Sequence, residues 1–159
     1  MPQELHLAGT KIYQRPIAKT YENLTALSAL SLENQAEIAH LDRAHMKFNA
    51  NNQAFKLDFF QNAKGQKLTL SYDNGVLCLD RSATEQTELM EKFSTKRFCE
   101  VENLQNVEIF FDRSIVEIFL NDGEKVMTSR FFIAERKNQF TTERKLDLQI
   151  GYPTEIQYE

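Results

Sequence analysis

The chain has 159 residues, of which 42% are hydrophobic and 26% are charged, with 12 Phe, 5 Gly and 3 Pro. This composition suits one globular domain and excludes a low-complexity or disordered chain. The formal net charge is −4, and no cluster of Lys and Arg interrupts the mixture. We therefore expect neither nucleic acid nor anionic membranes as partners, because both need a concentrated basic face.

The amino-terminal residues carry no targeting signal. Residues 1–6, Met-Pro-Gln-Glu-Leu-His, lack the basic segment and long apolar run of a signal peptide. No stretch approaches the roughly 18 apolar residues of a membrane span. The sequon Asn23-Leu24-Thr25 is interpreted as a chance match. We therefore expect the chain in the cytoplasm.

The first periodic segment predicts a helix. Ile17, Tyr21 and Leu24 have the i, i+4, i+7 spacing of one helix face, and Pro16 precedes them. Residues 24–35 show no clear pattern. We expect one short helix near the amino terminus.

From residue 46 onward the dominant period is two, which is typical of strands. Leu68, Leu70 and Tyr72 alternate with polar residues, and Asn74-Gly75 then separates this run from residues 76–79. An Asn-Gly step between two such runs predicts a β-hairpin, because a type I′ turn needs positive φ at both central positions. Residues 82–85 resemble a helix capping box, but the polar residues that follow favour a loop or a single turn.

The same pattern recurs in the second half of the chain. Val107, Ile109 and Phe111 alternate before a turn at residues 112–114, and another turn follows at residues 121–124. About ten short strands at this spacing indicate an antiparallel sandwich or barrel. The remaining predicted strands are residues 46–50, 55–60, 115–120, 125–133, 146–150 and 155–158.

The candidates for metal or nucleophile chemistry are few. His6, His40 and His45 form no cluster at ligand spacing, so neither a metal nor a cofactor is predicted. Cys78 and Cys99 lie in apolar stretches, where we expect buried thiols, with a disulfide as the alternative. There is no Gly-x-Ser-x-Gly elbow and no Gly-rich phosphate loop.

Paired carboxylates are the better candidates for catalysis. Asp112 with Glu117, and Asp73 with Asp80, flank turns, and glycoside hydrolysis needs two carboxyl groups across a sugar. Acidic residues at hairpin ends are also common for turn reasons alone, since their side chains bond back to the local backbone. Spacing alone therefore favours a turn-forming role over catalysis for these four carboxylates.

Three separated motifs resemble one family. Residues 107–124, VEIFFDRSIVEIFLNDGE, followed by Thr-Ser-Arg-Phe-Phe at 128–132, resemble the signature of the C-terminal sandwich of glycoside hydrolase family 32. That family contains invertases, sucrose-6-phosphate hydrolases, levanases and inulinases. Residues 71–82 resemble the preceding hairpin of that family. Residues 1–16 resemble the segment that closes its catalytic propeller, so the resemblance runs from Met1 to about Ile133.

The resemblance implies that this chain is not an enzyme by itself. In the family the catalytic residues all lie in a five-bladed propeller, in a Trp-Met-Asn-Asp-Pro-Asn-Gly-like motif, an Arg-Asp-Pro motif and a Glu-Cys motif. This chain has no Trp, no Asp-Pro and no Glu-Cys. No catalytic residue is therefore assigned. The resemblance implies that residues 1–16 are the end of the propeller segment and a linker, and that residues 17–159 are the sandwich.

The motif residues receive structural interpretations. The residues at 112–114 and 121–123 suit turn-forming roles. Glu117 interrupts an apolar run and is expected to face the rim, a basic partner or the propeller. Contact with another domain or with sugar is the alternative. The motif residues are Asp80, Arg81, Asp112, Arg113, Ser114, Glu117, Asn121, Asp122 and Gly123.

The predicted fold is all-β: an antiparallel sandwich of two facing sheets, concanavalin- or jelly-roll-like, with at most one short helix. Alternating inward side chains form the core of such a fold. The predicted core residues are Phe55, Leu57, Phe59, Leu68, Leu70, Leu77, Ile109, Phe111, Ile118 and Phe131.

Two functions follow from the resemblance and the residues. The first is a non-catalytic accessory domain that braces the propeller of a β-fructofuranosidase-type enzyme acting on sucrose or sucrose 6-phosphate, with a homodimer as a further expectation. The second is a carbohydrate-binding module, against which the absence of Trp counts, because sugar sites rely on exposed aromatic platforms.

Overall fold

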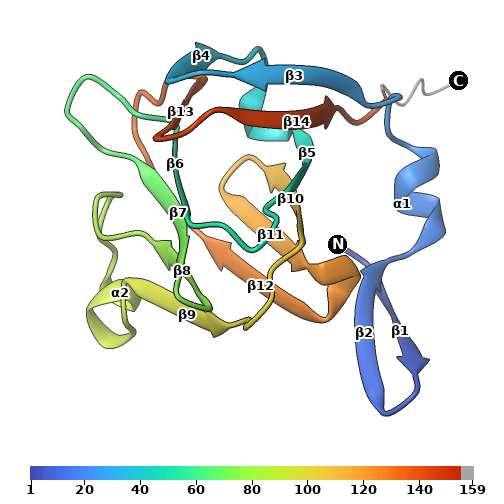
Figure 1. Ribbon diagram of the computed structural model, residues 1–159. Coiled ribbons are helices and arrows are strands. Elements are labelled where there is room, and N and C mark those ends of the chain that lie inside the picture. Colours follow the sequence, from blue (N-terminus) through green and yellow to red (C-terminus); the bar gives the residue numbers. More distant parts are fainter. Residues whose placement is uncertain (155–159) are drawn as a thin grey trace, which may run out of the picture.

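The computed structural model describes residues 1–154, apart from the side chain of Leu89, and contains two six-stranded antiparallel sheets. We name them sheet I, with the strand order β12-β11-β10-β5-β14-β3, and sheet II, with the order β4-β13-β6-β7-β8-β9. The sheets face each other around one core (Figure 1). The predicted antiparallel sandwich is confirmed.

The strands have the following bounds. Sheet I contains β3 (Ser28–Leu32), β5 (His45–Asn49), β10 (Asn106–Asp112), β11 (Ile115–Leu120), β12 (Lys125–Arg130) and β14 (Leu146–Gly151). Sheet II contains β4 (Gln35–Glu37), β6 (Phe55–Phe59), β7 (Leu68–Asp73), β8 (Val76–Asp80), β9 (Lys96–Glu100) and β13 (Gln139–Thr142). The strand predicted at residues 155–158 lies outside the described residues.

The predicted hairpins are confirmed by their turns. Between β7 and β8, Asn74 and Gly75 have φ of 48° and 77°, as a type I′ turn requires. Between β10 and β11, Arg113 has φ of 53°, and Asp112 pairs with Ile115.

The core consists of the inward rows of both sheets together with buried side chains from the adjoining loops. All ten predicted core residues are buried. At its centre Phe59 stacks on Phe140 at a centroid distance of 4.7 Å, and Phe111 meets the edges of Phe59 and Phe60 at 5.1 and 5.0 Å. Such offset and edge-to-face pairs are the favoured aromatic geometries.

The helices require one correction. The predicted amino-terminal helix is α1 (Ala18–Glu22), but a second short helix, α2 (Glu88–Lys92), is also present, so the prediction of at most one helix was wrong. Met90 of α2 is buried. The five residues of α2 are too few to show a helical period in the sequence. Two single 3₁₀ turns, η1 (Leu41–Arg43) and η2 (Asn121–Gly123), complete the elements.

The cysteines also differ from expectation. Both are free and half-buried rather than buried. In the β8–β9 register Cys78 lies opposite Phe98 and Cys99 lies opposite Leu77, so the two thiols are on opposite faces of sheet II. Burial raises the pKa of both thiols. These residues are therefore not a disulfide pair.

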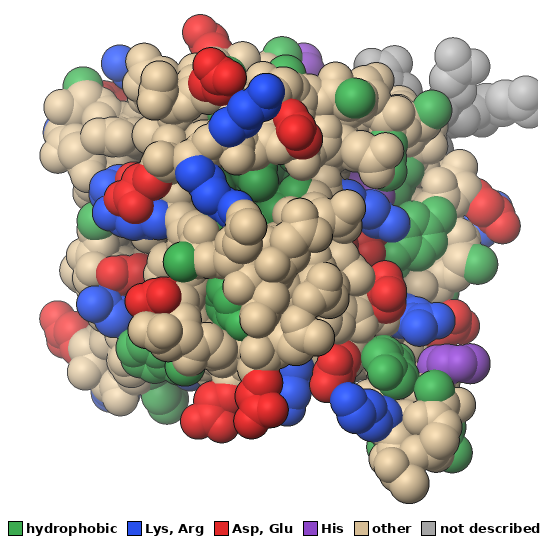
Figure 2. All heavy atoms as spheres, viewed as in Figure 1, with side chains coloured by type: hydrophobic (Ala, Val, Ile, Leu, Met, Phe, Trp, Pro, Cys, Tyr) green, Lys and Arg blue, Asp and Glu red, His purple; other side chains and the backbone are tan. Residues whose placement is uncertain are grey.

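The amino-terminal residues form a separate hairpin. Strands β1 (Gln3–Ala8) and β2 (Lys11–Pro16) pair only with each other, and α1 connects them to the sandwich. The hairpin projects from the body at the lower right of Figures 1 and 2. Within the described residues, no helix is long and apolar enough to cross a membrane.

Candidate functional site

Four of the motif residues lie where the β1–β2 hairpin contacts the sandwich. We call Glu117, Asn121, Asp122, Gly123 and Glu124 the hairpin seat. Gly123 has φ of +96°, and a Cβ on it would overlap the carbonyl of Gln14 in β2. Only glycine therefore allows the backbone of the hairpin to approach η2 this closely.

Polar contacts hold the hairpin on this seat. Arg15 Nε donates a hydrogen bond to the carbonyl of Asp122 at 2.8 Å. Lys11 Nζ lies 3.1 Å from Glu124 Oε1. The hydrogen bond from Lys11 lowers the pKa of Glu124, and Glu124 in turn raises the pKa of Lys11. The hairpin is thus fixed by charge-assisted hydrogen bonds rather than by apolar packing.

Glu117 supplies the deepest part of the seat. Its side chain is buried although it carries a carboxylate. Gln3 Nε2 donates a hydrogen bond to Glu117 Oε2 at 2.9 Å. A buried carboxylate needs such a partner. The acidic residue that interrupts β11 therefore meets the amino-terminal segment.

Asn121 fixes the shape of η2. Its side-chain oxygen accepts a hydrogen bond from the backbone N–H of Gln105 at 2.8 Å, and its Nδ2 donates to the carbonyl of Asn103 at 2.9 Å. The N–H of Asp122 donates to Asn106 Oδ1 at 3.0 Å. These bonds hold Asn121 and Asp122 in left-handed backbone conformations, with φ of 50° and 59°.

The two faces of the hairpin differ in character. In the register Leu7 lies opposite Ile12 and Leu5 opposite Gln14, so the three apolar side chains share one face. Leu5, Leu7 and Ile12 are 73%, 68% and 63% exposed. We call this surface the apolar hairpin face; it is part of the projecting hairpin in Figure 2. An exposed apolar cluster on an otherwise polar hairpin indicates a contact surface.

The opposite face of the hairpin borders a polar groove. This groove has a volume of about 770 Å³ and lies between the hairpin and residues 100–106. Tyr13 and Arg15 line one side, with the guanidinium of Arg15 5.4 Å from the ring centroid of Tyr13. Asn103 and Gln105 line the other side. The groove offers the phenol ring of Tyr13 and the imidazole of His6 among amides and charged groups.

A partly buried polar cluster lies between α1 and the outer face of sheet I. His45 Nε2 lies 2.7 Å from Glu108 Oε1, and Tyr21 donates its hydroxyl to the same carboxylate at 3.1 Å. His45 also stacks on Phe110 at 4.3 Å, and Lys47 lies 3.5 Å from Glu108. Burial and the negative charge of Glu108 raise the pKa of Tyr21. The cluster fastens α1, and with it the hairpin, to sheet I.

The remaining motif residues lie elsewhere. The N–H of Arg113 donates to the Asp42 carbonyl at 2.8 Å, and the carbonyl of Ser114 accepts from the N–H of Phe131 at 2.9 Å, while Asp112 is exposed. At the end of β8, the carboxylate of Asp80 accepts from the N–H of Ser82.

Arg81 is buried beside this turn. Its guanidinium donates to the carbonyls of Arg130 at 3.1 Å and Ser94 at 3.0 Å. The structure thus brings Glu117, Asn121, Asp122 and Gly123 together, and leaves the Asp112–Ser114 turn and the Asp80–Arg81 pair outside the seat.

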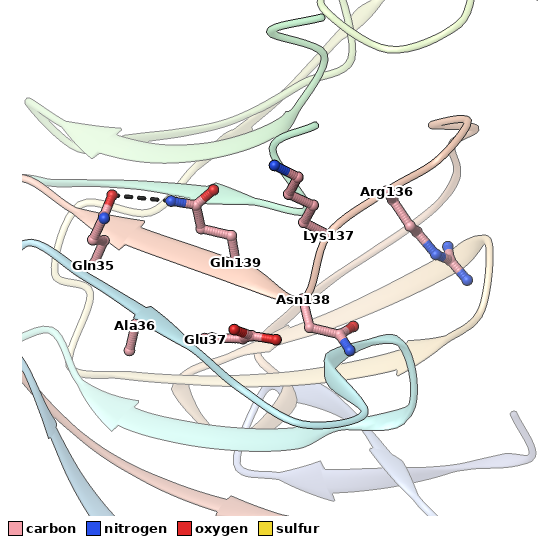
Figure 3. A pocket seen from close by; sticks show the side chains of 7 residues that line it. All are labelled: Gln35, Ala36, Glu37, Arg136, Lys137, Asn138 and Gln139. Atoms are coloured by element: carbon pink, nitrogen blue, oxygen red, sulfur yellow. Dashed lines mark hydrogen bonds between the residues drawn. The ribbon is translucent and has the colours of Figure 1, made fainter. Parts of the chain in front are cut away.

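A second pocket lies along β4 and β13. It measures about 550 Å³, and Figure 3 shows its polar lining, in which Gln139 donates a hydrogen bond to Gln35 at 2.9 Å. Glu37, Arg136, Lys137 and Asn138 complete the polar side chains. None of the lining residues is aromatic, so this pocket lacks the stacking surface that sugars favour.

The three histidines that were considered as metal ligands lie apart from one another. His6 lies on β1, His40 precedes η1, and His45 begins β5. Within residues 1–154, no group of three or more His, Cys, Asp or Glu side chains is arranged to hold a metal ion.

The sequence did not predict a site role for the hairpin residues. Gln3, Lys11, Gln14 and Arg15 were not singled out, although all four contact the seat. One signal could have found them. Gly9 and its neighbour Thr10 stand between two alternating runs, which is the pattern of a hairpin turn.

Comparison with known proteins places these features in a family. Residues 8–147 match the model of the family described as Glycosyl hydrolases family 32 C terminal. The chain is 30% identical over 133 residues to the sucrose-6-phosphate hydrolase of Streptococcus mutans serotype c, covering 82% of this chain and 27% of that protein. It is 32% identical over 136 residues to the sucrose-6-phosphate hydrolase of Salmonella typhimurium, covering 83% and 25%.

Solved structures share the fold. The sucrose-6-phosphate hydrolase of Lactobacillus gasseri superimposes with a TM-score of 0.79 at 21% identity, covering 96% of this chain and 33% of that one. The family 32 β-fructofuranosidase of Bombyx mori gives 0.71 at 21% identity, covering 96% and 32%. The chain thus spans between a quarter and a third of the length of these relatives. It belongs to the C-terminal domain family of the family 32 glycosyl hydrolases.

Proposed function

We propose that this chain is the non-catalytic accessory domain of a sucrose-6-phosphate hydrolase-type enzyme and braces its catalytic propeller. The catalytic domain is then the principal partner. The observation that carries the proposal is the apolar hairpin face, where Leu5, Leu7 and Ile12 are exposed on a hairpin that is itself firmly anchored.

We also propose a domain boundary, which the same contacts support. Residues 1–16 are the end of the propeller segment and the linker, and residues 17–159 are the sandwich. The hairpin pairs with neither sheet, yet Gly123, Arg15 and Glu117 fix its direction relative to sheet I. A rigid hairpin can set the angle between two domains, whereas a flexible linker cannot. The seat thereby determines where the propeller stands.

The parent enzyme is proposed to act on sucrose 6-phosphate, as the names of the relatives state for those proteins. Its place is then the cytoplasm, because a charged sugar phosphate does not cross a bilayer unaided. A homodimer is compatible with the proposal. In that case the dimer contact lies on a surface other than the apolar hairpin face, which the propeller covers.

The test adds the separately produced catalytic domain of the parent enzyme to this chain. We expect one complex in sedimentation velocity and an increase in the Tm of the chain by several degrees, because a partner that binds only the folded state stabilises it. Changing Leu5, Leu7 and Ile12 together to Ser is expected to abolish this gain. It should leave the Tm of the isolated chain unchanged, since the three side chains are exposed.

The matched control is Phe98→Ser. Phe98 is 65% exposed on β9 of sheet II and is not part of the apolar hairpin face, so the variant removes exposed apolar surface at another place. The proposal fails if the catalytic domain gives no complex, or if Phe98→Ser and the triple variant weaken the complex equally.

The second candidate function is carbohydrate binding in the polar groove. Its support is Tyr13, which lines the groove together with Asn103, Gln105 and several charged groups. Amides and carboxylates bind sugar hydroxyls, and an aromatic ring packs on the sugar face. The test is an NMR titration with sucrose, sucrose 6-phosphate, fructose and a short fructan. Saturable shifts that Tyr13→Ala abolishes would support it, and four flat titrations would exclude it.

A further inference from the structure

A third pocket lies at the open side of the sandwich. The edge strands β9 of sheet II and β12 of sheet I both contribute to it, and α2 borders it (Figure 1, lower left). Its volume is about 550 Å³. Met90, Phe93, Ile115 and Phe132 form apolar walls, and Phe93 and Phe132 are exposed. The pocket is separate from the hairpin seat.

Three arginines line the same pocket. They are Arg81, Arg97 and Arg130, and no carboxylate is among the lining residues. Among the residues that the structure describes, none of the three has a carboxylate within ion-pair distance. The neighbouring Asp80 pairs with Lys96 at 3.5 Å instead. No ion pair within the described part of the chain therefore neutralises the three guanidinium groups.

Arg81 shows the consequence of this arrangement. Its side chain is only 7% exposed, its two terminal nitrogens donate to backbone carbonyls, and its Nε has no partner in the described residues. Burial, and then the positive charge of Arg97, lower the pKa of Arg81. A buried cation without an anionic partner costs free energy, which a bound anion would offset.

We propose that this pocket binds a small amphiphilic anion: a carboxylate, sulfate or phosphate head group carried by an apolar chain or ring. The head group binds Arg97 and Arg130 in the field of the fixed Arg81. The apolar body packs against Phe93 and Phe132. The volume falls within the range of roughly 300–1,000 Å³ that is usual for small-molecule sites. Guanidinium groups bind such oxyanions through paired hydrogen bonds.

The test compares four probes in NMR titrations of this chain. Octanoate has the proposed head and tail, octanol lacks the charge, octylammonium has the opposite charge, and inorganic sulfate lacks the tail. We expect octanoate to give saturable shifts at residues 90–97 and 128–132, with a Kd at least tenfold below those of the other three probes. Equal affinities for octanoate and octanol would overturn the proposal. Shifts confined to other residues would also overturn it.

Variants separate the pocket from the general charge of the molecule. Arg97→Gln changes an exposed side chain, and we expect it to weaken octanoate about tenfold while leaving octanol binding and the Tm unchanged. Phe93→Ala should weaken both octanoate and octanol. The control is Lys64→Gln, which removes one exposed positive charge outside the pocket. The proposal is wrong if Lys64→Gln and Arg97→Gln weaken octanoate equally, or if neither does.

Discussion

The space between the two sheets and the hairpin seat are built from different chemistry. Between the sheets, alternating apolar side chains are buried and aromatic rings such as Phe59 and Phe140 stack directly. At the seat, Arg15, Lys11 and Gln3 make polar contacts, while the apolar residues of the hairpin remain exposed. The difference teaches that burial of apolar side chains holds the sandwich together, whereas polar contacts position the hairpin.

The largest expected effect tests the sandwich side of this comparison. Phe59→Ala removes a fully buried ring that contacts Phe111 and Phe140, and we expect it to lower the free energy of unfolding by about 3–5 kcal/mol. The exposed Phe98→Ala is the matched control, with an expected change below about 0.5 kcal/mol. Urea denaturation measures both. Similar losses in the two variants would mean that burial does not dominate the core.

The next effect tests the hairpin seat. Gly123→Ala forces a Cβ against the Gln14 carbonyl at a positive φ, so we expect the hairpin to shift or detach at a cost of about 1–3 kcal/mol. Amide hydrogen exchange should then speed up in residues 3–16 and stay slow in β6 and β7.

Gly65→Ala separates the two causes. Gly65 also has a positive φ, of 77°, but nothing lies within 4 Å of the added Cβ. The backbone cost alone is about 1–2 kcal/mol. If Gly65→Ala also speeds exchange in the hairpin, the close approach at Gly123 is not the cause.

A smaller effect concerns α1, the connection between the two regions. Tyr21→Phe removes the hydroxyl that donates to Glu108, and a loss of about 1–2 kcal/mol is expected in urea denaturation. Tyr13→Phe, which leaves the Glu108 cluster intact, should change the stability by less than about 0.5 kcal/mol.

The pKa of Tyr21 adds a pH dependence to this contact. Burial, and then Glu108, raise this pKa, so the neutral phenol is the form that the fold stabilises. Its contribution is complete below the ordinary tyrosine pKa of about 10 and is lost as the pH rises through the higher folded value. Stability curves of the wild type and Tyr21→Phe should therefore converge in alkali. Parallel curves would contradict the assignment.

The smallest effect is at the exposed rim of the seat. Lys11→Met removes the partner of Glu124, so the pKa of Glu124, which Lys11 lowers, is expected to rise toward its ordinary value. Because the folded pKa is depressed, the pair stabilises the fold above the ordinary glutamate pKa, and this is lost as the pH falls through the folded value. Carboxyl NMR titration measures the shift. An unchanged pKa in Lys11→Met would show that the pair does not persist in solution.

How much the sequence could predict differs between the same two regions. Alternation is a local signal, so Leu68, Leu70 and Ile109 could be assigned to the core from their immediate neighbours. The contact between Gln3 and Glu117 joins residues 114 positions apart, and no spacing encodes it. The resemblance identified Glu117 and Gly123 as motif residues, but only the structure shows that their contacts come from the β1–β2 hairpin. The helix α2 was missed because its five residues are too few to show a helical period.

The pairing of β3 with β14, and of β4 with β13, has a consequence for synthesis on the ribosome. β3 begins at Ser28, and its partner strand β14 ends at Gly151, so the contact order of the fold is high and slow folding is expected. At typical rates of protein synthesis, β14 is completed on the order of ten seconds after β3. During that interval the nascent chain exposes unpaired strands, and chaperones have their opportunity to bind it.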